Sequence, residues 1–585
     1  MPHATTLSAP PKVVDVAIIG AGWYGLVAAR TYLRLEPDTN IAIIESANSV
    51  GGVWSKDRIY PNLVAQVKHG LFNYTDTPMP KEGATKNDLV TGYMIQDYLE
   101  KYARDHDLLR RIQFNNWVEK AERCPRGWRL RLKGSGNIIE TAKLMVATGV
   151  TSIPNMPEFD MSEASIPLTH SRDLGASVED LKSDDVQSAV VVGAAKSAYD
   201  AVYLLLSMGK KVTWLIRPDG SGPMPILPTE MFGCNSIAVG STRLMSYLSP
   251  SIINSTGPIC SFFQRTAIGR WITGAFWDNT THMSEKDAGF AKGDHIAALK
   301  PEVKEKSAFW CNSGLGIVTI PDFWPTLHGG DLKVVRDNID SVKGDSLLLQ
   351  SGDVLHADYI VSCTGWGDHF GMFDAELKTE LGLPAFANTL PGGRSKEDIA
   401  WEKHDVAATK TVDERLPFLA QGPELKTPKA NDASAQRRWR LYKRAVPLNL
   451  ALKDDRSLVI LGQIHTIQTP MVSEIQSFWS ILYLLGELDL PDEATMTREI
   501  AEWNVWTRKR YISQGQKFPY CIFDFLPYLD GLCEDAGINP RRKGNFLSEL
   551  FSPYRPEDFR GFVDEYLAKR PPRKSLDDGS SVGSG

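Results

Sequence analysis

The sequence predicts an α/β protein that contains two Rossmann-type dinucleotide-binding units. Residues 13–45 and 188–218 carry this prediction, because each stretch reads as an apolar strand, a turn of small residues, a helix and a second apolar strand. The third observation is the length of 585 residues. One hydrophobic core rarely serves a chain of this size, so we expect two or more domains.

The first unit has a complete glycine fingerprint. Gly20 permits the tight turn after the strand, Gly22 lets the backbone approach a pyrophosphate, and Gly25 lets the helix pack close to the sheet. Glu45 ends the second strand, where a carboxylate can accept hydrogen bonds from an adenosine ribose. With all of these parts in order, the stretch predicts dinucleotide binding and not an ordinary strand-to-helix turn.

A second pair of glycines shortly after the first unit indicates which dinucleotide binds. Gly51-Gly52-Val53-Trp54 offers backbone without Cβ atoms, followed by an aromatic side chain. This combination suits a flat and bulky ring system lying along the chain. We therefore favour FAD over NAD at the first unit, with Gly52 and Trp54 as additional candidate contacts.

The second unit departs from the glycine fingerprint. Gly193 begins its turn, but Ala195 and Ala198 occupy the next two glycine positions, so this turn is less open than the first. Arg217 replaces the acidic residue at the end of the second strand. A guanidinium there can bind a 2′-phosphate, which favours NADPH over NADH, and the alternative is a solvated arginine at a strand end.

Composition and cysteine usage exclude several classes of protein. The formal net charge of −6 gives no electrostatic reason to expect nucleic acid as a partner. The seven cysteines are odd in number and never form C-x-x-C, which argues against a disulfide framework, a zinc site and a redox dithiol. Residues 1–12 lack a signal-peptide pattern, and no apolar run reaches the about 18 residues of a membrane span. We expect a cytoplasmic protein, and peripheral membrane contact stays open.

Two dinucleotide units in this order resemble the class B flavoprotein monooxygenases, the group of the flavin-containing and Baeyer–Villiger monooxygenases. The resemblance covers most of residues 13–490 and includes Ala147-Thr148-Gly149, Cys363-Thr364-Gly365-Trp366 and a closing helix over residues 470–488. It implies FAD at the first unit and NADPH at the second. The cofactor-binding candidates are Gly20, Gly22, Gly25, Glu45, Gly52, Trp54, Gln66, Val118, Ala147, Thr148, Gly149, Gly193, Lys196, Ser197, Arg217, Thr364 and Gly365.

The resemblance also implies a discontinuous FAD domain with the NADPH domain inserted into it. The expected parts are a flexible N-terminus (1–12), a first FAD part (13–180), the NADPH domain (181–345), a second FAD part (346–490), a helical C-terminal region (491–572) and a disordered tail (573–585). For the aromatic-rich insertion at 218–337 we rank packed core first, then a substrate pocket, then a surface that dips into a membrane. The basic stretch 439–445 predicts a solvated helix.

Two positions depart from the family pattern. Gln66 stands where amine- and sulfur-oxidising relatives carry an active-site Asn and Baeyer–Villiger relatives carry an Asp. Its carboxamide has the same donor and acceptor groups as Asn, which makes Gln66 the candidate catalytic residue, and the alternative is that it satisfies backbone groups. Only His170 remains of the family's central signature, so we favour a structural role for it.

The implied function is an NADPH- and FAD-dependent monooxygenase. Such an enzyme inserts one oxygen atom from O₂ into a small organic substrate through a C4a-hydroperoxyflavin, here at nitrogen or sulfur of a molecule like those of secondary metabolism. A Baeyer–Villiger monooxygenase is one alternative, and an NADPH-dependent flavin reductase or oxidase without oxygen insertion is another. We expect no metal, because the histidines are not grouped like metal ligands.

Overall fold

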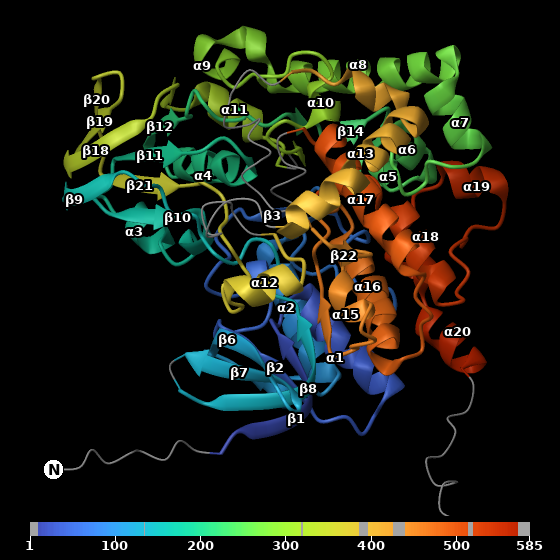
Figure 1. Cartoon of the computed structure of the whole chain (residues 1–585). Coiled ribbons are helices and arrows are strands. Elements are labelled where there is room, and N and C mark those ends of the chain that lie inside the picture. Colours follow the sequence, from blue (N-terminus) through green and yellow to red (C-terminus); the bar gives the residue numbers. More distant parts are fainter. Residues whose placement is uncertain are drawn as a thin grey trace, which may run out of the picture.

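The computed structural model describes residues 10–133, 135–317, 320–384, 396–424, 439–512 and 519–570, without the side chains of 396–398. The predicted tail at 573–585 and most of the predicted N-terminal segment lie outside these ranges. Figure 1 shows one α/β unit at the bottom, a second at the upper left, and a helical region at the right.

The first sheet is built from both ends of the chain. Its strands are β1 (Lys12–Ile19), β2 (Ile41–Ile44), β5 (Ile112–Gln113), β6 (Trp117–Cys124), β7 (Gly127–Lys133), β8 (Ile138–Val146) and β24 (Leu458–Ile460). β1, β2, β5 and β8 are parallel neighbours, and β24 pairs in parallel with the last residues of β8. Because β24 follows the whole second unit in sequence, this sheet confirms the predicted α/β fold with a discontinuous first domain.

Two helices cover the first sheet close to its glycine turn. α1 (Trp23–Leu35) connects β1 to β2, and α16 (Thr469–Leu485) packs along α1. α16 is buried along almost its whole length because α18 (Phe525–Asp535) lies against it as well. A helix that is covered on all sides reads as apolar throughout, which explains the Phe, Trp, Ile and Leu content of α16.

The second sheet is entirely parallel, in the order β10-β21-β11-β12-β17. Its strands are β10 (Leu168–His170), β11 (Ser188–Val192), β12 (Lys211–Leu215), β17 (Leu332–Val335) and β21 (Tyr359–Ser362). α4 (Lys196–Ser207) connects β11 to β12 and is packed by α11 (Phe323–Gly329). A small sheet beside it contains β9 (Asp160–Ala164), β18 (Ile339–Gly344), β19 (Ser346–Leu349) and β20 (Val354–His356).

Sheet membership differs from the predicted domain borders at 180 and 345. β10 precedes the first border and β21 follows the second, yet both belong to the second sheet. The strands of the second unit and its small sheet therefore extend from residue 160 to residue 362. The glycine turn marks only β11 and β12 in the sequence, whereas β21 joins the sheet by pairing with β11 and β10 joins it by pairing with β21.

Much of the aromatic insertion is packed core, the interpretation ranked first. Its helices are α5 (Ser236–Gly240), α6 (Arg243–Leu248), α7 (Pro258–Arg265), α8 (Ala267–Ala288), α9 (Asp294–Ala297) and α10 (Ser307–Trp310). Apart from α9, which packs on β17, they pack with α13 (Lys396–Arg415), α17 (Glu493–Arg510), α18 and α19 (Phe546–Phe551), directly or through one another, and α20 (Phe562–Lys569) contributes to the same apolar cluster. Trp277 and Phe309 are fully buried. Within the described ranges, no helix has the length and apolar content needed to cross a bilayer.

The prediction of a solvated basic helix at 439–445 is wrong. The chain forms a hairpin there, between β22 (Leu441–Tyr442) and β23 (Val446–Pro447), with Lys443 and Arg444 at positive φ in the turn. Arg444 is only 2% exposed, because its guanidinium lies over the rings of Trp439 and Trp503. Aromatic faces take the place of water around this cation.

Candidate active site

The first glycine turn is sterically closed to side chains. Gly20 has φ of 107°, and a Cβ atom on it would lie 2.4 Å from the carbonyl oxygen of Ala147. A Cβ atom on Gly25 would lie 1.8 Å from the carbonyl oxygen of Gly20. The N-cap of α1 is Gly22, which has no side chain to cap the helix, so the first-turn N–H groups are left for an anionic ligand.

The second pair of glycines lies against this turn. The Gly51 N–H donates to the Ala21 carbonyl at 3.0 Å. A Cβ atom on Gly22 would lie 3.6 Å from the Cα atom of Gly52, and Trp54 follows half-buried in the short 3-10 helix η1 (Gly52–Trp54). The structure thus brings these sequence-predicted residues together.

Glu45 also stabilises the glycine turn, a structural role that the sequence did not indicate. Its carboxylate is 6% exposed and accepts the Ala21 N–H at 2.7 Å and the Ala47 N–H at 2.8 Å. The side chain therefore fixes the backbone of the glycine turn. The Ser46 hydroxyl also donates to Oε1, which leaves Oε2 with a further lone pair, so Glu45 can still accept a hydrogen bond from a ribose.

Buried polar atoms at the carboxyl edge of the first sheet fit a bound FAD. Thr148 Oγ1, Gln113 Nε2 and Gln463 Nε2 are buried and have no hydrogen-bond partner among the described residues. Open α/β sheets bind their ligands at this edge, and buried groups without partners are destabilising. The glycine cradle and these donors and acceptors together match what the pyrophosphate, sugar and flavin parts require.

The side chain of Val118 packs in the hydrophobic core. It is 5% exposed and belongs to the apolar cluster that contains Leu130 and Leu132. Two residues earlier, the Asn116 N–H donates to the Glu45 carbonyl at 2.9 Å. Because the side chain of Val118 is buried in this cluster, only its backbone is left for the predicted cofactor contact.

The second turn repeats the geometry of the first with a more open surface. A Cβ atom on Gly193 would lie 2.4 Å from the carbonyl oxygen of Cys363. α4 begins at Lys196 with Ala195 as its N-cap, and Ser197 is half-buried. The Lys196 ammonium pairs with Asp200. Arg217 is exposed and forms no ion pair with any residue that the structure describes, so it is available to a 2′-phosphate.

The two segments that connect the units run side by side. The Asn155 N–H donates to the Gly365 carbonyl at 3.0 Å, and the Gly367 N–H donates to the Ile153 carbonyl at 2.9 Å. The Thr364 hydroxyl donates to the Asn155 carbonyl. Thr364 and Gly365 thus hold the two connections together, whereas Thr148 keeps a hydroxyl without a partner among the described residues.

His170 ties the second sheet to these connections. Its Nδ1 atom accepts the Arg172 N–H at 3.1 Å, so Nε2 carries the proton and donates to the Gly365 carbonyl at 3.0 Å. Burial lowers the pKa of the imidazole, which keeps it neutral. The Trp366 ring lies edge-on at 5.1 Å. These contacts support the structural role favoured for His170.

Gln66 connects the two units. It lies on β3 (Val64–Lys68), and its Oε1 atom accepts the Ile317 N–H of β16 (Gly316–Ile317) at 2.7 Å. The side chain therefore does satisfy a backbone group, the alternative considered for it. Its Nε2 group remains a hydrogen-bond donor.

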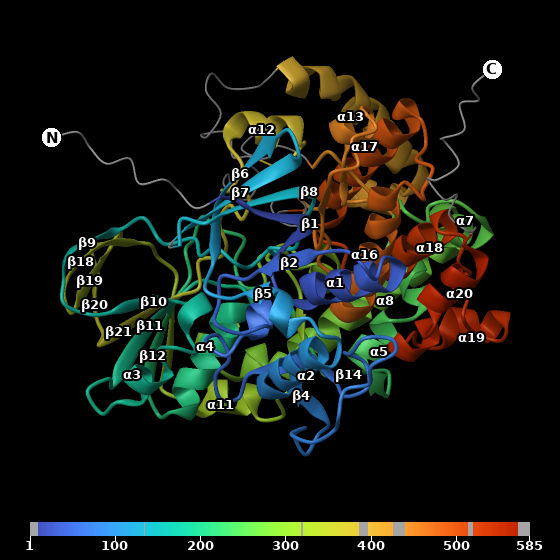
Figure 2. The ribbon, with the colours of Figure 1, turned by 90° about the horizontal axis from the view of Figure 1, so that it is seen from below.

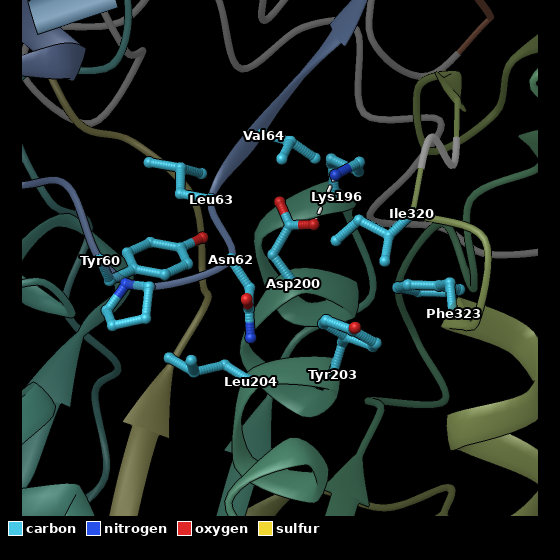
Figure 3. Close-up of a pocket in the computed structure, with 11 residues that line it drawn as sticks. Tyr60, Asn62, Leu63, Val64, Lys196, Asp200, Tyr203, Leu204, Ile320 and Phe323 are labelled. Atoms are coloured by element: carbon cyan, nitrogen blue, oxygen red, sulfur yellow. Dashed lines mark hydrogen bonds and ion pairs between the residues drawn. The ribbon is translucent and has the colours of Figure 1, made fainter. Parts of the chain in front are cut away.

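A narrow pocket of about 20 Å³ opens between the units, just before Gln66 (Figure 3). The chain segment of the first unit that precedes Gln66 forms one wall, and α4 forms another. The lining residues are Tyr60, Pro61, Asn62, Leu63, Val64, Lys196, Asp200, Tyr203, Leu204, Ile320 and Phe323. The Lys196–Asp200 ion pair faces this space. A space of this size holds about one water molecule, so this pocket does not accommodate an organic substrate.

Nothing in the sequence indicated that His465 and Tyr520 lie in contact. His465 follows β24 in a loop whose neighbouring residues are buried, yet its own side chain is exposed, and desolvation lowers its pKa to about 4. The Tyr520 ring lies 5.0 Å from His465, and a Cβ atom on Gly314 would lie 2.9 Å from the Tyr520 hydroxyl. The only sequence feature that could have drawn attention to His465 is its position between the last sheet strand, β24, and the closing helix, α16.

Comparisons with known proteins agree with this geometry. A family model described as pyridine nucleotide-disulphide oxidoreductase matches residues 17–225. "FAD-dependent monooxygenase DEP4" of Fusarium langsethiae is 40% identical over 569 residues, covering 96% of each chain. "FAD-dependent monooxygenase resA" of Aspergillus sclerotiorum is 36% identical over 95% of this chain and 98% of the relative.

Solved structures show the same fold at low identity. Cyclohexanone monooxygenase from Rhodococcus sp. Phi1 bound to NADP⁺ has a TM-score of 0.58 and 15% identity, over 90% of this chain and 97% of the other. S-allyl-L-cysteine S-oxygenase from Allium sativum has a TM-score of 0.51 and 16% identity, over 96% and 94%. With both cofactor turns in place and near full-length relatives, the chain belongs to the FAD-dependent monooxygenases of the class B flavoprotein type, enzymes that use FAD and NADPH.

Proposed function

We propose that this enzyme transfers one oxygen atom from O₂ to a nitrogen or sulfur atom of a small molecule like those of secondary metabolism. The observation that carries the proposal is the carboxamide of Gln66, held between the two units by the Ile317 N–H. A neutral carboxamide, whose Nε2 atom donates to no residue that the structure describes, stands where a Baeyer–Villiger enzyme is expected to have a carboxylate. It can donate a hydrogen bond, which a carboxylate cannot do.

The residues of the chain bind the cofactors and shield the reaction. FAD, when bound, activates O₂ with electrons that NADPH supplies. The turn at Gly20 and the start of α1 hold the pyrophosphate of FAD, and Arg217 binds the 2′-phosphate of NADPH. His465, whose pKa desolvation lowers to about 4, is neutral near pH 7.

The test is an oxygen-isotope experiment with matched substrates. The FAD-loaded enzyme is given NADPH, ¹⁸O₂ and, separately, a tertiary amine, a thioether and a cyclic ketone. We expect one ¹⁸O atom in the amine or thioether product. Conversion of only the ketone to a labelled lactone would favour the Baeyer–Villiger alternative, and NADPH consumption with H₂O₂ and no labelled product from any substrate would favour a reductase or oxidase.

Two variants of Gln66 connect this result to the proposed residue. Gln66→Asn keeps the carboxamide on a shorter arm, and Gln66→Asp replaces it with an acceptor-only carboxylate. We expect Gln66→Asn to retain part of the oxygen transfer and Gln66→Asp to lose at least about tenfold, the effect of one hydrogen bond in the transition state. Equal loss in both variants, with flavin content unchanged, would show that the Nε2 donor is not required.

A further inference from the structure

The start of α8 departs from the usual amphipathic pattern, although the helix also buries Trp277 further along. It buries Thr273, Thr280 and Ser284, while Ile268 is 65% exposed and Trp271 is 71% exposed. A surface helix ordinarily buries its large apolar side chains and exposes its polar ones. The start of α8 therefore presents an aliphatic and an aromatic side chain outward.

A second group of exposed apolar side chains lies on α19. On this six-residue helix, Phe546 and Leu547 are each 65% exposed and Phe551 is 55% exposed. α19 packs on α6, α6 on α7, and α7 on α8. α7 and α19 form the right-hand edge of the molecule in both Figure 1 and Figure 2. We call this the apolar edge, with the members Phe262 (42% exposed), Ile268, Trp271, Phe546, Leu547 and Phe551.

Basic side chains accompany the apolar edge. Arg265 is exposed and Arg270 half-exposed, and neither forms an ion pair with a described residue. Arg270 donates only to the backbone carbonyls of Gln264 and Arg265. Arg541, shortly before α19, is exposed with its nearest carboxylate 4.0 Å away. This local positive charge contrasts with the net charge of −6 of the whole chain.

We propose that the apolar edge docks on an anionic lipid bilayer. Its aromatic and aliphatic side chains enter the boundary between headgroups and acyl chains, and the arginines meet the negatively charged headgroups. A second copy of this chain is a poorer occupant, because a two-fold contact through the edge would bring the same arginines face to face. The inference is independent of the proposed substrate chemistry.

The test is flotation of the FAD-loaded full-length protein with vesicles. The vesicles consist of phosphatidylcholine alone or of phosphatidylcholine mixed with phosphatidylserine. We expect binding to the mixed vesicles that weakens with salt. Arg265→Gln should lower the partition coefficient about fivefold, since each basic residue near the surface contributes roughly 1 kcal/mol. The double variant Ile268→Ser/Trp271→Ser should lower it at least about tenfold.

Val354→Ser is the matched control. Val354 is 51% exposed on β20, at the opposite edge of the molecule, and its replacement should leave vesicle binding unchanged. The bound flavin absorbance of each variant reports folding, because none of these positions lies at a cofactor turn. Absence of binding to both vesicle types would overturn the proposal, as would a concentration-dependent dimer without vesicle binding that Ile268→Ser/Trp271→Ser dissociates.

Discussion

The two dinucleotide units have glycine turns of the same geometry, but the protein surrounds the first turn more closely than the second. Gly20 meets the Ala147 carbonyl and Gly193 meets the Cys363 carbonyl, and in each case a Cβ atom would lie 2.4 Å from the oxygen. At the third position of the turn, Gly25 leaves no room for a methyl group, whereas Ala198 is accommodated and fully buried. The first helix therefore sits closer to its turn than the second.

The residues that follow the second strand of each unit, β2 and β12, show the same difference in exposure. Glu45 is 6% exposed and bonded to the glycine turn, whereas Arg217 is exposed and forms no ion pair with a described residue. A buried and fixed site suits a cofactor that stays bound, and an open site suits one that enters and leaves in each cycle. We infer that one fold has been adapted to a resident FAD and to an exchanging NADPH.

The largest expected effect comes from replacing Gly25 of the first unit with alanine, the residue that the second unit has at the same position, Ala198. Gly25→Ala puts a methyl group 1.8 Å from the Gly20 carbonyl oxygen, so the helix has to shift away from the turn. We expect protein without bound flavin or no folded protein at all, measured by flavin absorbance per chain. Ala198→Gly, the converse change, should cost only about 1 kcal/mol and keep the flavin. Normal flavin content in Gly25→Ala would contradict the close packing.

Arg217→Gln tests the open end of the second unit. Loss of a charge-assisted hydrogen bond, worth roughly 1.5–3 kcal/mol, should raise the Kd for NADPH about 10- to 100-fold and leave the Kd for NADH unchanged. Arg336→Gln is the control, since Arg336 follows the neighbouring strand β17 but is paired with Glu302. Equal weakening of NADPH and NADH would show that Arg217 does not read the 2′-phosphate.

Thr148 and Thr364 form a matched pair at corresponding positions of the two units. The Thr148 hydroxyl is buried without a partner among the described residues, whereas the Thr364 hydroxyl bonds to Asn155 and to Ser362. Thr148→Val should weaken FAD binding several-fold and leave the stability of the flavin-free protein unchanged. Thr364→Val should lower that stability by about 1 kcal/mol and leave FAD affinity unchanged. Flavin titration and thermal unfolding separate the two, and identical behaviour would remove the distinction.

The smallest expected effect concerns pH and a buried carboxyl beside the first unit. Glu474 on α16 accepts the Thr75 N–H at 2.7 Å, and burial raises the pKa of its carboxyl to about 8 from a usual 4.5. The folded state therefore holds the proton more tightly, and stability falls as pH rises from about 4.5 to 8. Glu474→Gln removes this titration, so its Tm should gain roughly 2 °C relative to wild type over that range. Parallel pH curves would contradict a buried, protonated Glu474.

The sequence revealed local constraints and missed those made by distant segments. The glycine spacing predicted both turns, because the steric requirement for Gly20 arises within a few residues of the turn and at the adjacent strand end. It placed Gln66 near the centre but gave no indication of Ile317 as its partner. It also misjudged Arg444, whose burial depends on Trp503 from α17, far along the chain. The membership of β10 and β21 in the second sheet and the contact of His465 with Tyr520 could not be predicted for the same reason, because each depends on segments far apart in the sequence.

The most direct test of the central claim is rapid-mixing absorbance spectroscopy on the purified, flavin-loaded enzyme. The protein is reduced anaerobically with NADPH or NADH and then mixed with O₂, while the flavin spectrum is recorded. We expect much faster reduction by NADPH than by NADH, followed by a long-lived species that differs from both reduced and oxidised flavin. Immediate return to oxidised flavin, equal reduction by both nucleotides, or the absence of bound flavin would contradict it.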